Sequence, residues 1–148
     1  MKNIRNKVFE TNSSSSHSIT IEKGDLLNTL EITDGEVNIY PNEFGWEVET
    51  YVSASIKASY CMIYARDWAT GFSDKSYALK MLEKVIKDHT GAKKVNLNLG
   101  EKDGEYYNDG YIDHQSGDVA EEAFSSEESL RNFIFNPNSI LMTDNDNH

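Results

Sequence analysis

The stretch YVSASIKASYCMIYARDW, residues 51–68, predicts a helix at the centre of the fold. Apolar side chains recur along it at helical spacing, at Val52, Ile56, Tyr60 and Ile63. Cys61, Met62 and Tyr64 extend the apolar surface around the other side, and the alanines within the stretch favour a helix. A helix that is apolar over so wide an arc is typical of a buried position. We therefore expect this helix to be the central one.

The segments before this helix predict strands. Residues 30–39 carry alternating apolar positions on either side of Asp34-Gly35, which is the pattern of a hairpin around a tight turn. Residues 41–45 interrupt that pattern, because proline and glycine fall there. Three short strands are therefore expected ahead of the helix, at residues 17–21, 30–32 and 37–39.

The segments after the central helix alternate between helical and strand patterns. A second helix is expected from a cap at Ser73 or Asp74 to about His89, and Gly91 then stands in the usual position after the end of a helix. A third is expected after the capping-box arrangement Ser125-Ser126-Glu127-Glu128 and should stop before Asn136-Pro137. Strand patterns occupy residues 95–99, 110–114 and 139–143, and the acidic, glycine-rich residues 100–110 predict an exposed loop or hairpin tip.

Together these elements predict one α+β domain over residues 1–148, in the order βββ-αα-ββ-α-β. The domain should hold about three helices and a mostly antiparallel or mixed sheet. A chain of 148 residues, of which 38% are hydrophobic and 11% aromatic, fits a single domain. The chain has no run of the ~20 apolar residues that a membrane helix needs, and Met1–Arg5 has no apolar segment behind it, so we expect no membrane association and no secretory signal. The one cysteine, Cys61, predicts a buried thiol in a reducing cytoplasm.

The net charge of -11 disfavours direct, nonspecific binding to nucleic acid or to an anionic membrane surface. Residues 101–128 hold ten acidic side chains against one lysine, Lys102. Such a surface can simply keep the protein in solution. It can also imitate the phosphates of nucleic acid and occupy a basic groove on a partner protein.

The run from Thr11 to Ser18, TNSSSSHS, brings hydroxyls, an amide and an imidazole together just before a strand pattern. These groups bind phosphate or other polar ligands, with Lys2, Arg5 and Lys7 as a source of positive charge. Serine-rich segments also serve as flexible linkers. The candidate ligand-binding residues of the run are Asn12, Ser13, Ser14, Ser15, Ser16, His17 and Ser18.

Two further polar clusters, at residues 113–116 and 144–147, also fall at the ends of expected strands. If the first, fifth and last strands are neighbours, all three clusters meet. Asp113, His114 and Gln115 therefore join the candidate ligand-binding residues. The carboxylates near the C-terminus could suit a hard cation, but they lack the rest of a calcium loop, so no metal and no cofactor is expected.

The residues Arg5–Ser18, RNKVFETNSSSSHS, resemble the start of a set of small bacteriophage and prophage proteins. Residues 110–116 and 139–147 are similar to segments of the same set. The resemblance implies a phage origin, and with it a location in the host cytoplasm, but it brings no mechanism and no catalytic residue.

Three functions are compatible with these features. The leading hypothesis is a phage-type accessory protein that sequesters a small phosphorylated or nucleotide ligand, a counter-defence role. The first alternative is an acidic inhibitor that binds a basic host protein by imitating nucleic-acid charge. The second is a small transferase or hydrolase with His17 or His114 as general acid–base. Because no complete catalytic set is present, binding is favoured over turnover, and the oligomeric state stays open.

Overall fold

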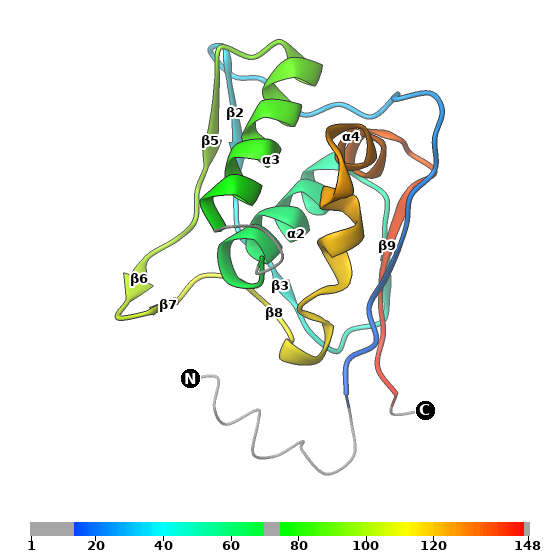
Figure 1. Cartoon of the computed structure of the whole chain (residues 1–148), viewed down its shortest axis with the longest axis vertical. Helices are drawn as coiled ribbons and strands as arrows, with labels where there is room; N and C mark the ends of the chain where they lie inside the picture. Colours follow the sequence, from blue (N-terminus) through cyan, green and yellow to red (C-terminus); the bar gives the residue numbers. More distant parts are fainter. Residues whose placement is uncertain (1–13, 70–74, 147–148) are drawn as a thin grey trace.

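Helix α2 (Ala54–Asp67) lies at the centre of the computed structural model, which describes residues 14–69 and 75–146 (Figure 1). Every residue from 57 to 66 is buried, which confirms that this helix is central. It begins later than the pattern predicts, because the side chain of Ser53 accepts a hydrogen bond from the backbone N–H of Ile56 and so caps the helix there. Tyr51 belongs instead to a strand.

Two further α-helices pack around α2. Helix α3 (Lys75–Thr90) ends where Gly91, at φ +76°, donates its N–H to the carbonyl oxygen of Lys87. Helix α4 (Glu127–Phe135) follows two 3-10 helices, η1 (His114–Ser116) and η2 (Val119–Ser125). The N-cap of α4 is Ser126, which accepts a hydrogen bond from Ser129 N–H (2.9 Å). The sequence pattern placed the cap at Ser125, paired with Glu128, which is one residue too early. Ser125 is instead the last residue of η2.

The strands form four small sheets. Strand β9 (Ile140–Thr143) lies antiparallel between β1 (Ser18–Thr20) and β4 (Glu49–Tyr51). The pairs β2 (Glu36–Ile39) with β5 (Lys94–Leu97), and β3 (Glu43–Phe44) with β8 (Tyr111–Ile112), are parallel. Strands β6 (Lys102–Asp103) and β7 (Tyr106–Tyr107) form the expected hairpin tip. This mixed arrangement confirms the α+β class.

Of the hairpin predicted over residues 30–39, only the turn is formed. Asp34-Gly35 does make a turn, closed by the bridge between Thr33 and Glu36. Residues 30–32, however, form no strand. Strand β2 pairs instead with β5, in the register Val37 to Val95, because that pairing buries both valines against the helices.

The core fills the space between the helices and the strands. The β1-β9-β4 sheet lies along one side of the three α-helices and the β2-β5 pair along the other (Figure 1). No helix in the described part of the chain is long and apolar enough to cross a membrane. The largest fully buried apolar and aromatic side chains are Phe44, Tyr60, Met62, Ile63, Tyr64, Leu82, Ile86, Phe124, Leu130, Phe133 and Phe135.

Two cations of α2 are also buried, and both bind backbone carbonyls. The Lys57 amine, which is 0% exposed, donates to the carbonyl oxygens of Asn136 (2.9 Å) and Ser139 (2.8 Å). These bonds fasten α2 to the turn that precedes β9. Burial lowers the pKa of the Lys57 amine from 10.5 to about 8. Arg66, the second buried cation, lies at the other end of α2 and belongs to the groove described below.

Candidate functional site

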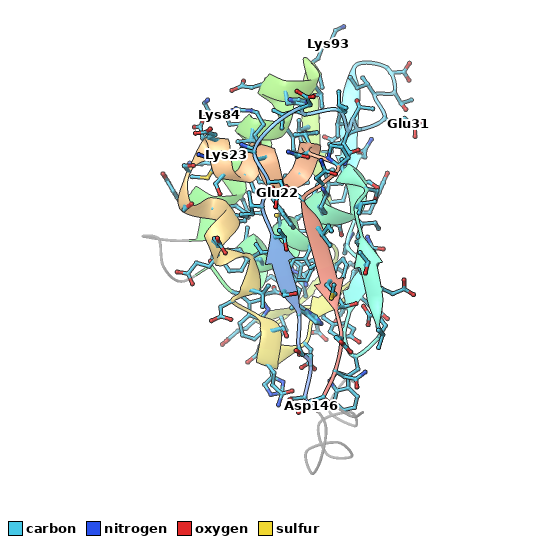
Figure 2. The ribbon with its side chains drawn as sticks, turned by 90° about the vertical axis from the view of Figure 1, so that its right-hand side faces the viewer. Glu22, Lys23, Glu31, Lys84, Lys93 and Asp146 are labelled. Atoms are coloured by element: carbon cyan, nitrogen blue, oxygen red, sulfur yellow. The ribbon has the colours of Figure 1, made fainter. Side chains whose placement is uncertain are left out.

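The first and last polar clusters meet because β1 and β9 are antiparallel partners. Residues just before β1 therefore lie beside residues just after β9. Ser15 and Asn145 form a β-bridge, and Ser16 N–H donates to the carbonyl oxygen of Asp144 (2.9 Å). Figure 2 shows these strands from the front, with Asp146 at the end of the molecule where the two segments meet.

The middle cluster joins them through Ser15. The Ser15 hydroxyl donates to Asp113 Oδ2 (2.9 Å) and lies 2.7 Å from the Ser116 hydroxyl. Its backbone N–H donates to Gln115 Oε1 (3.2 Å). The three clusters therefore converge, but not through the neighbouring first, fifth and last strands on which that expectation depended. The route differs, because β8 pairs with β3 and the middle cluster reaches Ser15 through η1, which Asp113 caps.

The donors of Ser14 are occupied by a carboxylate of the chain itself. Its backbone N–H donates to Asp146 Oδ1 and its hydroxyl to Asp146 Oδ2, both at 2.7 Å. A carboxylate held by one N–H and one O–H is bound as a phosphate would be. Asp146 thus takes the place that the sequence assigned to a phosphorylated ligand.

His17 uses both ring nitrogens inside the protein. Nε2 lies 2.7 Å from the carbonyl oxygen of Gly45, so the hydrogen-bond network assigns the proton to Nε2. Nδ1, at 3.0 Å, then accepts from the Tyr60 hydroxyl. Burial lowers the pKa of the His17 imidazole, and this effect exceeds the opposing ones of the Gly45 carbonyl and of Glu47 and Asp113. His17 is therefore a neutral cross-link between β1, α2 and the turn after β3.

We call this connected set the polar clasp. It joins two carboxylates and includes no lysine or arginine, so its charge does not favour an anion. Of the other candidate ligand-binding residues, Ser16, Ser18 and His114 are exposed, whereas Asn12 and Ser13 lie outside the described residues, as do Lys2, Arg5 and Lys7. The clasp residues are Ser14, Ser15, His17, Asp113, Gln115, Ser116 and Asp146.

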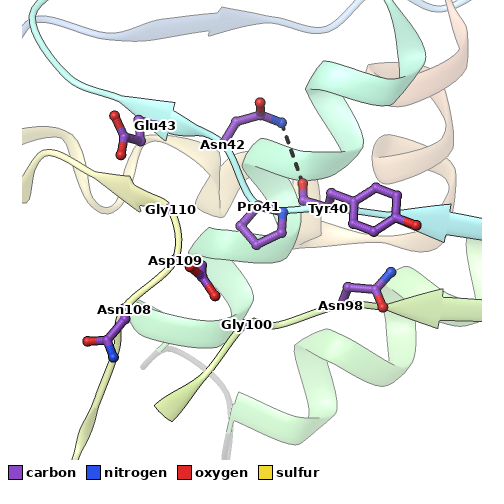
Figure 3. A pocket seen from close by; sticks show the side chains of 9 residues that line it. All are labelled: Tyr40, Pro41, Asn42, Glu43, Asn98, Gly100, Asn108, Asp109 and Gly110. Carbon is purple, nitrogen blue, oxygen red and sulfur yellow. Dashed lines mark hydrogen bonds between the residues drawn. The ribbon is translucent and has the colours of Figure 1, made fainter. Parts of the chain in front are cut away.

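A second site, which the sequence did not reveal, is an open groove of about 720 Å³ (Figure 3). It lies where the chain leaves β2 and β5 and where it enters β8. The carboxyl ends of parallel strands commonly border ligand sites. Its lining residues are Tyr40, Pro41, Asn42, Glu43, Asn98, Gly100, Asn108, Asp109 and Gly110.

Helix α2 holds the walls of the groove in place. The buried Arg66 guanidinium donates to the carbonyl oxygens of Leu99 (2.8 Å), Asp109 (2.7 Å) and Gly110 (3.0 Å). It also pairs with Asp67 through two hydrogen bonds (2.7 and 2.8 Å). All five N–H donors of the Arg66 guanidinium are engaged. The segments at Leu99 and at Asp109-Gly110, which form the lower wall of the groove, are therefore held to the same planar group and to each other.

The upper wall of the groove is held by a serine of the same helix. The Ser59 hydroxyl donates to the carbonyl oxygen of Tyr40 (2.6 Å) and accepts from the Asn42 amide (3.0 Å). Gly110, at φ +72°, lies so close to this wall that an added Cβ would be 2.6 Å from Pro41 Cβ. Hydrogen bonds from α2 therefore hold both walls of the groove.

Acidic side chains line the groove and continue onto the neighbouring hairpin. Glu43 and Asp109 belong to the lining, whereas Glu101, Asp103 and Glu105 are exposed between the lining residues Gly100 and Asn108. We call these five residues the acidic face. One feature of the sequence could have indicated this acidic face. Residues 24–56 hold seven acidic side chains and no lysine or arginine.

The strand pairs bring this segment together with the acidic residues 95–126, which hold eight acidic side chains against the one lysine Lys102. Figure 2 shows Lys84 and Lys93 toward the end of the molecule opposite Asp146, where Glu31 also lies.

Comparison with known proteins gives no match: no family model, no curated protein and no solved structure matches this chain.

Proposed function

We propose that this protein is a binding protein that engages a basic surface of a partner protein with its acidic face. The observation that carries the proposal is the groove within that face, which has two carboxylates but no lysine or arginine among its lining residues. Two tyrosines lie exposed in the same region, Tyr40 at 60% and Tyr106 at 77%. Exposed tyrosines are enriched at protein interfaces.

The electrostatics favour a cationic partner over an anionic one. A chain with a net charge of -11 attracts basic surfaces at long range and repels phosphates. The two buried cations, Lys57 and Arg66, bind backbone carbonyls and add no positive charge to the surface. The sequence resemblance to phage and prophage proteins directs the search to basic host proteins that bind nucleic acid, with counter-defence as the role.

The two other hypotheses receive less support from the described residues. A phosphorylated ligand at the polar clasp would have to displace Asp146 from Ser14. An enzyme that uses His17 as acid–base would first have to free one of its nitrogens from Tyr60 or Gly45. The geometry therefore favours binding through the acidic face.

Charge reversal on the acidic face tests the proposal. The wild type should capture proteins from a bacterial lysate at 50 mM salt, and the variant E101K/D103K/E105K should fail to capture them. Raising the salt concentration should release the same proteins from the wild type. The matched control E121K/E122K/E128K makes an equal change in net charge on three exposed residues of η2 and α4. The proposal is supported if the wild type and the control both capture proteins with basic surfaces and the variant E101K/D103K/E105K does not.

A nucleotide screen provides the opposing result. A thermal shift with mono-, di- or cyclic nucleotides that alanines at Ser14 and His17 abolish, together with capture that both charge-reversal variants retain, would overturn the acidic-face proposal. That result would establish the clasp as a phosphate site.

A further inference from the structure

We infer that the groove is a receptor for an arginine side chain of the basic partner. The inference rests on the proposed function and specifies which chemical group the groove recognises. A volume of about 720 Å³ is ample for a guanidinium and its methylene stem. Recognition of such a group depends on which hydrogen-bonding atoms the groove still offers.

The amide nitrogens of two of the asparagines are already used by the protein. Asn98 Nδ2 donates to the carbonyl oxygens of Ile39 (3.0 Å) and Asn96 (3.2 Å). Asn42 Nδ2 donates to the Ser59 hydroxyl (3.0 Å) and to the carbonyl oxygen of Tyr40 (3.4 Å). An amide has two N–H donors, so these two side chains have no N–H left for a ligand, whereas the third asparagine of the lining, Asn108, has no side-chain partner among the described residues and keeps both its donors and its acceptor.

The carboxylates add further acceptors. In Figure 3 the Asp109 side chain points into the space between the upper wall and Gly100. Its Oδ2 accepts from the backbone N–H of Glu101 (3.1 Å), and within residues 14–69 and 75–146 no donor reaches Oδ1. Glu43 contributes a second, exposed carboxylate to the lining.

A groove rich in acceptors selects a ligand rich in donors. The guanidinium has five N–H donors and no acceptor, so it matches the offered atoms, whereas phosphate has acceptors alone. The exposed Tyr40 ring provides a face on which a planar cation stacks, and arginine stacks better than lysine. Because Arg66 is paired with Asp67 beneath the groove, its charge does not oppose a second guanidinium.

Three peptides that differ only in the head group test this assignment. Acetylated peptides with three arginines, three lysines or three citrullines are titrated into the full chain at 50 mM salt, and binding is followed by NMR. We expect the arginine peptide to bind several-fold tighter than the lysine peptide and to shift the side-chain amide signals of Asn42 and Asn98. Citrulline keeps the shape but not the charge and should bind most weakly.

Two single substitutions locate the binding. D109N preserves an oxygen for the Glu101 N–H and should weaken the arginine peptide about tenfold, since one charge-assisted pair is lost. The matched control E122Q removes one exposed charge outside both the acidic face and the groove lining, and it should change affinity less than twofold. Circular dichroism checks that both variants fold as the wild type does.

The outcomes separate this inference from the proposed function. Equal affinity for the arginine and lysine peptides, with equal effects of D109N and E122Q, would overturn the arginine receptor while salt-sensitive capture by the acidic face still stands. If the arginine peptide binds in the groove as expected but the lysate experiment shows no dependence on the acidic face, the groove is confirmed and the partner-protein proposal fails.

Discussion

Replacing Lys57 with methionine should change how the stability of the protein depends on pH. In the folded protein the buried Lys57 amine has a pKa of about 8, whereas an unfolded lysine has 10.5. Between these values the unfolded chain binds more protons than the folded one, so the free energy of unfolding rises with pH. In the variant this contribution is absent.

The size of the effect follows from the two pKa values. Each pKa unit corresponds to about 1.4 kcal/mol, so the charged amine costs the folded state roughly 3 kcal/mol at pH 7. About 2 kcal/mol of that cost disappears between pH 7 and pH 9.5. K57M also leaves the carbonyls of Asn136 and Ser139 without their donor, which costs roughly 1–3 kcal/mol each, but this offset is the same at every pH.

Urea unfolding followed by circular dichroism at several pH values measures the difference. The difference between wild type and K57M should grow by about 2 kcal/mol from pH 7 to pH 9.5 in favour of the wild type. Burial raises the pKa of Cys61 and of Tyr60, and both groups oppose the gain in stability at high pH. Both are present in each chain, so their contribution is removed by the subtraction.

The matched control is K87M, which removes an exposed lysine from α3. Its stability profile should run parallel to that of the wild type. A difference between wild type and K57M that stays constant within about 0.5 kcal/mol across this pH range would refute the reasoning, because burial would then impose no cost on the charged amine.

Three more predictions concern the clasp and the groove. Because burial lowers the pKa of His17, the wild type should lose stability as pH falls below about 6.5, and H17Q should lose less of it in urea unfolding over the same range. Gly110 and Gly104 both have positive φ, but of these two only Gly110 would place an added Cβ against neighbouring atoms, so G110A should lower the free energy of unfolding by ~1–3 kcal/mol more than G104A does in urea unfolding. Ser15 holds a buried carboxylate, so S15A should cost roughly 1–3 kcal/mol in urea unfolding, and a loss below ~0.5 kcal/mol would show that the clasp is not structural.

Local patterns in the sequence placed most of the elements correctly. The 3.6-residue spacing around Tyr60 and the glycine at the end of α3 act over a few residues, so they are visible without the fold. The strand-end rule named the three polar clusters but made their meeting depend on neighbouring strands, whereas the structure brings the middle cluster to Ser15 through η1. What the rule could not show is the role of those side chains, because a hydroxyl that binds a ligand and one that binds a neighbouring carboxylate look alike in sequence.

The remainder depended on contacts between distant residues. The partner of β2 is β5, about sixty positions further along, and the turn at Asp34-Gly35 gives no indication of it. The groove is likewise assembled from three separate segments. Its acceptor-rich character follows from hydrogen bonds that use up the donors of Asn42 and Asn98.

The sequence by itself determined the α+β class, the central helix and the acidic character of the chain, because periodicity, capping and charge are local or additive properties. The tertiary structure alone decided that His17 is a buried cross-link and that the acidic segments border one groove. The physical reason is that burial and hydrogen-bond pairing depend on which segments pack together, and packing is a property of the whole fold.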